Sequence, residues 1–141
     1  MRIVETYSHL NGEEYLLVKQ PDLYQEIKDV ITQVDALKCM TKKSKESTMK
    51  GKWLYSPKAL NKQFTNLFHQ KGWSESRYNY YVTTNRKYMD ELIKLPLKDQ
   101  QEYLIQKGVT NPIKSYKQTD FVKERVAVEV QFGKYAFVAF D

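Results

Sequence analysis

The strict alternation of apolar and polar residues over residues 126–132 constrains the fold of this chain more than any other feature. One side of this segment is apolar, with Val126, Val128, Val130 and Phe132, and the other side carries Ala127, Glu129 and Gln131. This period of two is typical of a strand with one buried face. Residues 119–122 form a shorter extended run, and the polar residues 123–125 lie between the two runs. The sequence therefore predicts an antiparallel hairpin that other elements must cover.

The length of the predicted turn sets the register of this hairpin. A turn centred on Glu124 and Arg125 places Phe121 opposite Val128, and Asp120 opposite Glu129. Directly opposed side chains have Cβ atoms about 4.5–5.5 Å apart. Two carboxylates at this distance repel each other unless they share a proton or bind a cation. Glu-Arg is not the Asn-Gly or Asp-Gly pair that tight hairpins prefer.

The opposed carboxylates indicate a cation site made of oxygen atoms. Gln131 returns to the same face as Glu129, and the carbonyl of Val130 lies between them. Mg²⁺ prefers such oxygen ligands and keeps several waters. The pattern leaves a simpler interpretation open, in which Asp120, Glu129 and Gln131 are only the solvated face of a strand.

The rest of the chain predicts helices and further strands, and hence an α/β fold. The spacing of Leu23, Ile27, Val30 or Ile31, and Val34 predicts an amphipathic helix from Pro21. A second apolar stripe, on a helix over 56–72, consists of Leu60, Phe64, Leu67 and Phe68. Ser56 is a good N-cap, Pro57 suits the first helical position and Gly72 can end that helix. The other expected elements are a strand over 2–7, a helix over 11–20, a strand over 78–83, a helix from Asn85 that breaks near Pro96 and resumes to 107–108, and a loop over 109–118.

Positive charge is concentrated in one polar stretch. The chain has 23 Lys and Arg against 17 Asp and Glu, a net charge of +6, and six lysines with one acid, Glu46, lie in residues 38–52. A cluster of this kind binds a nucleic-acid backbone through counterion release. A solvated loop with surplus lysines is the alternative.

Cysteine, histidine and hydropathy exclude several classes of protein. One cysteine, Cys39, excludes an internal disulfide and a zinc cluster based on cysteine. The two histidines, His9 and His69, are far apart in the sequence. No apolar run approaches the roughly 18 residues of a membrane span, and no signal peptide opens the chain. We expect a cytosolic protein with reduced thiols and no membrane partner.

The hairpin residues resemble a known nuclease motif. Asp120, Glu129 and Gln131 resemble the active-site motif of PD-(D/E)XK nucleases, in the variant in which the last Lys is Gln. The longer string over 119–135 is similar to the catalytic segment of type II restriction endonucleases of the BglII and BstYI kind, which cut around a GATC core. The resemblance extends to residues 1–5, 7–12, 54–57, 59–61, 72–73, 75–77 and 79–83.

This resemblance implies a fold, an activity and partners. The fold would be a restriction-endonuclease-like mixed central sheet flanked by helices. The activity would be that of a type II site-specific deoxyribonuclease, with Mg²⁺-dependent phosphodiester hydrolysis that leaves 5′-phosphates. The implied partners are double-stranded palindromic DNA, a second copy in a homodimer and a cognate DNA methyltransferase, in a prokaryotic cytoplasm.

The resemblance also implies a role for each site residue. Asp120 and Glu129 would ligate the metal together with the Val130 carbonyl, and Gln131 would orient the attacking water. An amide can hydrogen-bond a water but cannot take its proton, so the metal would supply most of the water activation. Glu75 or Ser76 would match an accessory residue that such sites take from an upstream helix.

Lysines would contact the DNA. Lys134 follows the catalytic strand, where the family meets the DNA groove, and a lysine can donate to guanine O6 and N7. A phosphate contact or plain exposure is the alternative for Lys134. Lys42, Lys43 and Lys45 would contact phosphates.

The family continues beyond the position that Asp141 occupies. We therefore expect residues 1–141 to be a catalytic domain whose C-terminal part is missing, with the dimer contact incomplete. Two rival functions remain open at this stage: a truncated, catalytically inactive remnant that still binds duplex DNA, and an interaction domain that binds no DNA.

Overall fold

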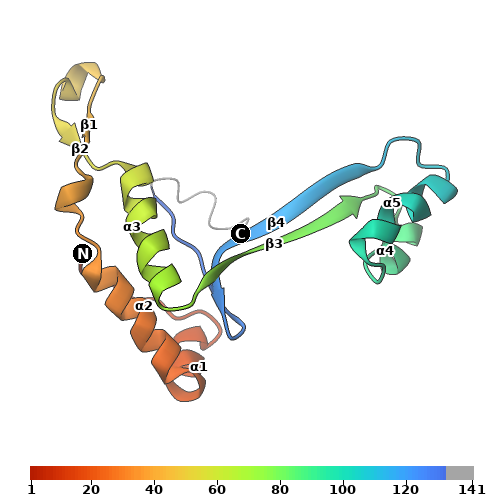
Figure 1. The fold of residues 1–141 in the computed structure, drawn as a ribbon, viewed down its shortest axis with the longest axis horizontal. Helices are drawn as coiled ribbons and strands as arrows, with labels where there is room; N and C mark the ends of the chain where they lie inside the picture. Colours follow the sequence, from red (N-terminus) through yellow and green to blue (C-terminus); the bar gives the residue numbers. More distant parts are fainter. Residues whose placement is uncertain (133–141) are drawn as a thin grey trace. The chain divides into compact units, whose positions relative to one another are not determined.

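The structure, a computed structural model, describes residues 1–132 and confirms the expected α/β class (Figure 1). The chain forms two compact units: unit 1 comprises residues 1–74 and the segment from Asp120 onward, and unit 2 comprises residues 75–119. The elements in chain order are α1 (Gly12–Lys19), α2 (Pro21–Gln33), the 3₁₀ helix η1 (Leu37–Cys39), β1 (Lys42–Lys43), the 3₁₀ helix η2 (Ser47–Met49), β2 (Trp53–Leu54), α3 (Pro57–Gln70), β3 (Ser74–Val82), α4 (Arg86–Leu92), α5 (Leu97–Gln106), β4 (Ile113–Lys123) and β5 (Val126–Val128).

Two amphipathic helices, α2 and α3, form the helical layer of unit 1. They contact each other, and α2 also contacts α1. The predicted apolar stripes are confirmed, because the buried residues of these helices are Leu23 and Val30 in α2 and Leu60, Phe64 and Phe68 in α3. The cap of α3 is also as predicted: Ser56 Oγ accepts a hydrogen bond from the Ala59 N–H at 3.3 Å.

The β4–β5 hairpin covers this helical layer. Phe121 of β4 stacks on Phe68 with ring centroids 4.4 Å apart. Trp73, which is almost fully buried, meets the edge of the Phe68 ring at 5.4 Å. The alternate residues Val126, Val128, Val130 and Phe132 pack against the same core, and Ala127, Glu129 and Gln131 are exposed. The two faces predicted from the alternation are therefore confirmed.

Three strands form one sheet in the order β3-β4-β5, and β1 and β2 form a separate antiparallel pair. Strands β4 and β5 are antiparallel, with Phe121 opposite Val128 and Lys123 opposite Val126, which is the predicted register. The turn residues Glu124 and Arg125 have φ values of 48° and 69°. A two-residue turn of this hand needs positive φ at both central positions, so the hairpin forms without the glycine that such turns favour.

In unit 2, helices α4 and α5 contact each other and follow one another in the chain between β3 and β4 (Figure 1). Asn85 caps α4 as predicted, with Oδ1 accepting from the Lys87 N–H at 3.1 Å. Gln100 of α5 is buried; its Oε1 accepts from the Tyr81 N–H and its Nε2 donates to the Leu95 carbonyl, both at 2.9 Å. This side chain links α5 to β3. No helix within residues 1–132 is long and apolar enough to cross a bilayer.

Four expected boundaries are wrong. Residues 2–7 form no strand; instead the N-terminal ammonium donates to the carbonyls of Thr32 and Val34. Strand β3 begins at Ser74 rather than at residue 78. The expected loop over 109–118 becomes strand from Ile113, because pairing within the sheet extends a segment whose own residues are mostly polar and exposed. Regular pairing of β5 ends at Val128 and does not reach residue 132.

Candidate active site

Two carboxylates lie together at the open end of the β4–β5 hairpin. The Asp120 N–H donates to Glu129 Oε1 at 3.3 Å, and the Val130 N–H donates to Asp120 Oδ2 at 3.0 Å. Asp120 is half-buried and Glu129 is exposed. The structure thus brings together Asp120, Glu129 and the backbone of Val130, as the register requires.

These hydrogen bonds begin where the backbone ladder stops. The last paired residues at this end are Phe121 and Val128, and backbone N–H groups beyond a ladder need other acceptors. The carboxylates of Asp120 and Glu129 accept from those groups. Hydrogen bonds to an ionised acceptor are the stronger kind, so the hairpin holds two negative groups close together.

The oxygen atoms at this place fit a hard divalent cation. Within residues 1–132, no group of three or more His, Cys, Asp or Glu side chains gathers at one place. The hairpin offers the oxygens of the two carboxylates, Asp120 and Glu129. Mg²⁺ is commonly held by one or two carboxylates, with waters and substrate phosphates completing the shell. Gln131 is exposed, two residues beyond Glu129 along the same segment.

An ion pair that the sequence analysis missed anchors the other end of the hairpin. Lys123 Nζ lies 2.8 Å from both carboxylate oxygens of Glu26 on α2, and 2.8 Å from the carbonyl of Lys71. Trp73 Nε1 donates to Glu26 Oε2, also at 2.8 Å. Partial burial raises the pKa of Glu26, but the hydrogen bonds from Lys123 and Trp73 outweigh burial and leave the pKa below its ordinary value. Glu26 is therefore ionised at neutral pH.

Glu75 and Ser76, the two candidates for an accessory site residue, lie on a strand. Helix α3 ends at Gln70, and Glu75 and Ser76 are exposed residues of β3. They follow the expected end of the helix, because the chain turns at Gly72, with φ of 81°, and becomes extended directly after Trp73. Glu75 accepts a hydrogen bond from Gln118 Nε2 within unit 2.

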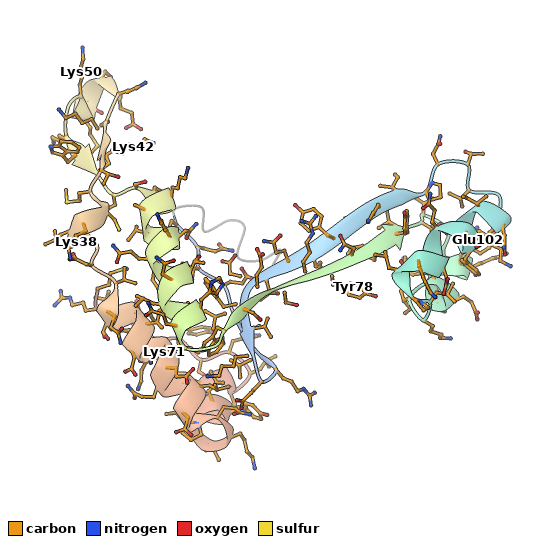
Figure 2. All side chains as sticks on the ribbon, in the orientation of Figure 1. Lys38, Lys42, Lys50, Lys71, Tyr78 and Glu102 are labelled. Atoms are coloured by element: carbon orange, nitrogen blue, oxygen red, sulfur yellow. The ribbon has the colours of Figure 1, made fainter. Side chains whose placement is uncertain are left out.

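Three of the predicted DNA-binding lysines lie on one small hairpin. Lys42 and Lys43 form β1, opposite Leu54 and Trp53 of β2, and Lys45 follows two residues later. All three lysines are exposed, and Figure 2 shows Lys42 and Lys50 in this region of unit 1. Lys43 Nζ lies 4.9 Å from the centroid of the Trp53 ring, a cation–π contact. Lys134 lies outside the described residues.

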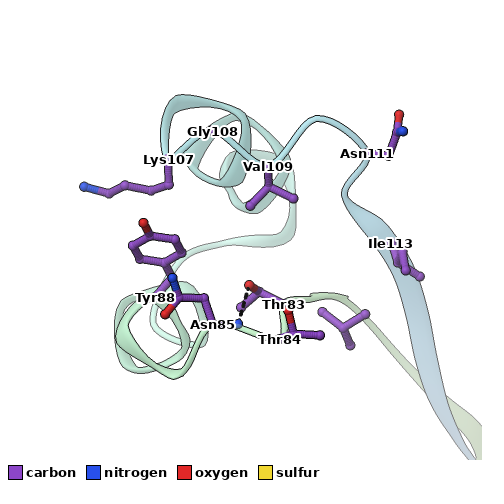
Figure 3. Close-up of a pocket in the computed structure, with 10 residues that line it drawn as sticks. Thr83, Thr84, Asn85, Tyr88, Lys107, Gly108, Val109, Asn111 and Ile113 are labelled. Carbon is purple, nitrogen blue, oxygen red and sulfur yellow. Dashed lines mark hydrogen bonds between the residues drawn. The ribbon is translucent and has the colours of Figure 1, made fainter.

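Unit 2 contains a cavity of about 460 Å³ that no sequence pattern indicated (Figure 3). The end of β3 and the start of α4 form one side, and the connection from α5 to β4 forms the other. Thr83 Oγ1 accepts from the Asn85 N–H at 3.1 Å. The other polar residues that line the cavity are Thr84, Tyr88, Lys107 and Asn111, so the lining has hydroxyls, amides and one cation. This set can bind a polar ligand but offers no carboxylate for metal chemistry.

Comparison with protein families identifies a match. The family described as Restriction endonuclease BglII/BglIII matches residues 4–141, nearly the whole chain. Comparison with curated proteins gives no match.

Proposed function

Because this chain belongs to the BglII/BglIII restriction endonuclease family, we propose that it cuts palindromic duplex DNA with a GATC core by Mg²⁺-dependent hydrolysis. The product ends would carry 5′-phosphates. The observation that carries this proposal is the adjacency of Asp120 and Glu129 at the end of the β4–β5 hairpin.

Each residue of the hairpin has a distinct task in this proposal. Asp120, Glu129 and the Val130 carbonyl would hold Mg²⁺. When bound, the cation lowers the pKa of a water and offsets charge that develops on the phosphate. Gln131 accepts a hydrogen bond from the attacking water and so aims it, while leaving the proton in place, because an amide is not a base at neutral pH.

Lysines outside the β4–β5 hairpin would bind the DNA. Lys42, Lys43 and Lys45 are exposed on and beside β1 and would neutralise phosphates. Such contacts give affinity and register but carry no base sequence. Lys134 would contribute a base contact.

The remaining proposals concern the assembly and the cell. A palindrome presents the same half-site twice, so a two-fold symmetric homodimer with one active site for each strand suits it. A cognate DNA methyltransferase in the same prokaryotic cytoplasm would protect the host sites.

The direct test is incubation of plasmid DNA with the protein in Mg²⁺ and in EDTA. We expect discrete double-strand cuts in Mg²⁺ alone, and loss of these cuts in Asp120→Asn and Glu129→Gln. Glu124→Gln is the matched control, because Glu124 is an exposed acid of the same hairpin outside the carboxylate pair. Salt-dependent binding without cuts would indicate an inactive DNA-binding remnant, and the lack of any DNA affinity would indicate an interaction domain.

A further inference from the structure

We infer that Glu26 of α2 is a positioning residue for the carboxylate pair. It holds the β4–β5 hairpin through Lys123 and thereby determines where Asp120 and Glu129 stand. This inference rests on the proposed function for its consequence in catalysis, but its structural part can be measured separately.

The contacts of Lys123 fix the position of its ammonium group. Its ammonium group has three donors, and three oxygens lie at 2.8 Å: Oε1 and Oε2 of Glu26 and the Lys71 carbonyl. The side chains of Lys123 and Glu26 are only 22% and 25% exposed. An ion pair that is partly withdrawn from water is screened less than a surface pair, so this contact restrains β4 strongly.

Glu26 is held in turn by a second donor. Trp73 Nε1 donates to Glu26 Oε2 at 2.8 Å, and the Trp73 ring is almost fully buried against Phe68. The acceptor is therefore fixed to the core at the C-terminal end of α3. Helix α2, the end of α3 and β4 all meet at this one carboxylate.

The hairpin needs such an anchor. Its regular pairing comprises three residue pairs, and its turn places two non-glycine residues at positive φ. Strand β3 pairs with the other edge of β4, so β5 is the edge strand of the described sheet and is joined to it through these pairs with β4. Phe121 packs on Phe68, but apolar packing has no preferred direction, whereas the Lys123 contacts are directional. Lys123 is three residues from Asp120 on the same strand, so a shift at Lys123 is transmitted to the carboxylates.

Helix α2 offers a matched control. Asp29, three residues after Glu26, also forms an ion pair, with Lys71 Nζ at 3.6 Å. That pair uses the Lys71 side chain and does not contact the hairpin itself, whereas the Lys71 carbonyl accepts from Lys123. Asp29→Asn removes the same charge from the same helix and should leave the carboxylate pair in place.

The test is amide hydrogen exchange at Asp120 and Val130, whose N–H groups donate to the two carboxylates. In Glu26→Gln we expect exchange at these two amides to accelerate about tenfold or more, because the local opening becomes easier. Amides within α2 and α3 should change less than about twofold. Asp29→Asn should change neither set. Glu26→Asp, which keeps the charge, should restore part of the protection.

Single-turnover cleavage at saturating protein supplies the second measurement. Glu26→Gln should slow cleavage about tenfold or more while the DNA dissociation constant stays within about twofold, because a misplaced group slows chemistry and leaves binding intact. Unchanged exchange at Asp120 and Val130 would overturn the inference whatever the activity. Faster exchange with unchanged cleavage would also overturn it.

Two further outcomes of these experiments also have a definite interpretation. If Glu26→Gln and Lys123→Met both lose protection throughout α2 and α3, Glu26 is a general stability contact and the positioning role is withdrawn. If the wild-type protein cuts no DNA, the proposed function fails, and the exchange data still decide whether Glu26 holds the hairpin.

Discussion

At the scale of single residues, the two carboxylates of the β4–β5 hairpin have both a structural role and a proposed catalytic role. Asp120 and Glu129 accept backbone N–H groups at the end of the ladder, and they are also the proposed ligands of the cation. Their substitution therefore affects local structure and chemistry together. Gln131, which is exposed beyond them, is the residue proposed to orient the attacking water.

We predict that Gln131→Ala slows single-turnover cleavage about 10²-fold or more, because positioning a nucleophile contributes several kcal/mol. DNA affinity should stay close to that of wild type. Gln131→Glu keeps an oxygen acceptor and adds negative charge, so metal affinity should hold or rise and cleavage should change only modestly. Rapid-quench kinetics with excess protein isolate the chemical step. If Gln131→Ala cleaved DNA as fast as the wild-type protein, Gln131 would not orient the attacking water.

At the scale of elements, the turn between β4 and β5 is a strained part of the fold. Glu124 and Arg125 occupy the left-handed region, which costs an ordinary L-residue roughly 1–2 kcal/mol. The strain is tolerated because Phe121 and Lys123 fasten the strand on one side of the turn, and Val126 and Val128 pack on the other. The hairpin is thus maintained by its tertiary contacts and not by its turn.

We predict that replacing Glu124-Arg125 by Asn-Gly raises the free energy of unfolding by about 1–2 kcal/mol, since both residues adopt positive φ readily. Urea unfolding followed by tryptophan fluorescence measures the change. As the opposite control, Ser56→Ala should lower the same quantity by about 1 kcal/mol, because α3 loses its N-cap. A destabilised Asn-Gly variant would show that Glu124 or Arg125 makes a contact worth more than the strain.

At the scale of the whole molecule, charge is distributed unevenly. The net charge is +6, and the β1–β2 hairpin and its flanks carry a dense set of lysines in unit 1. The lysines of unit 2 are interspersed with acids along α4 and α5. Long-range attraction of DNA should therefore depend on the lysines around the β1–β2 hairpin more than on the lysines of α4 and α5.

We predict that Lys42→Gln, Lys43→Gln and Lys45→Gln together weaken DNA binding and reduce the salt dependence, since each lost phosphate contact lowers the slope of log K against log salt by about 0.9. A reduction of about two to three in that slope is expected for three contacts. The matched control is the triple glutamine variant at Lys87, Lys94 and Lys98, which are exposed in unit 2. Fluorescence anisotropy across a salt series measures both slopes. Equal reductions in the two variants would show that these lysines contribute only to net charge.

Much of unit 1 was readable from the sequence because its signals are local. The N-cap at Ser56, the stripes of α2 and α3 and the alternation after Val126 depend on residues a few positions apart. The register that places Asp120 beside Glu129 follows from the length of the turn alone. A backbone has few low-energy conformations, and side chains select among them over short distances.

Only the tertiary structure decided the features that depend on distant residues. Strand β4 extends through residues expected to be a loop, because it pairs with neighbouring strands of the sheet. The polar sequence of this segment does not indicate that pairing. Residues 2–7 stay irregular, because an extended segment becomes a strand only beside another. Glu26 meets Lys123 across 97 positions of the chain. No periodicity encodes such a pair, since its geometry exists only once α2, α3 and β4 have packed together.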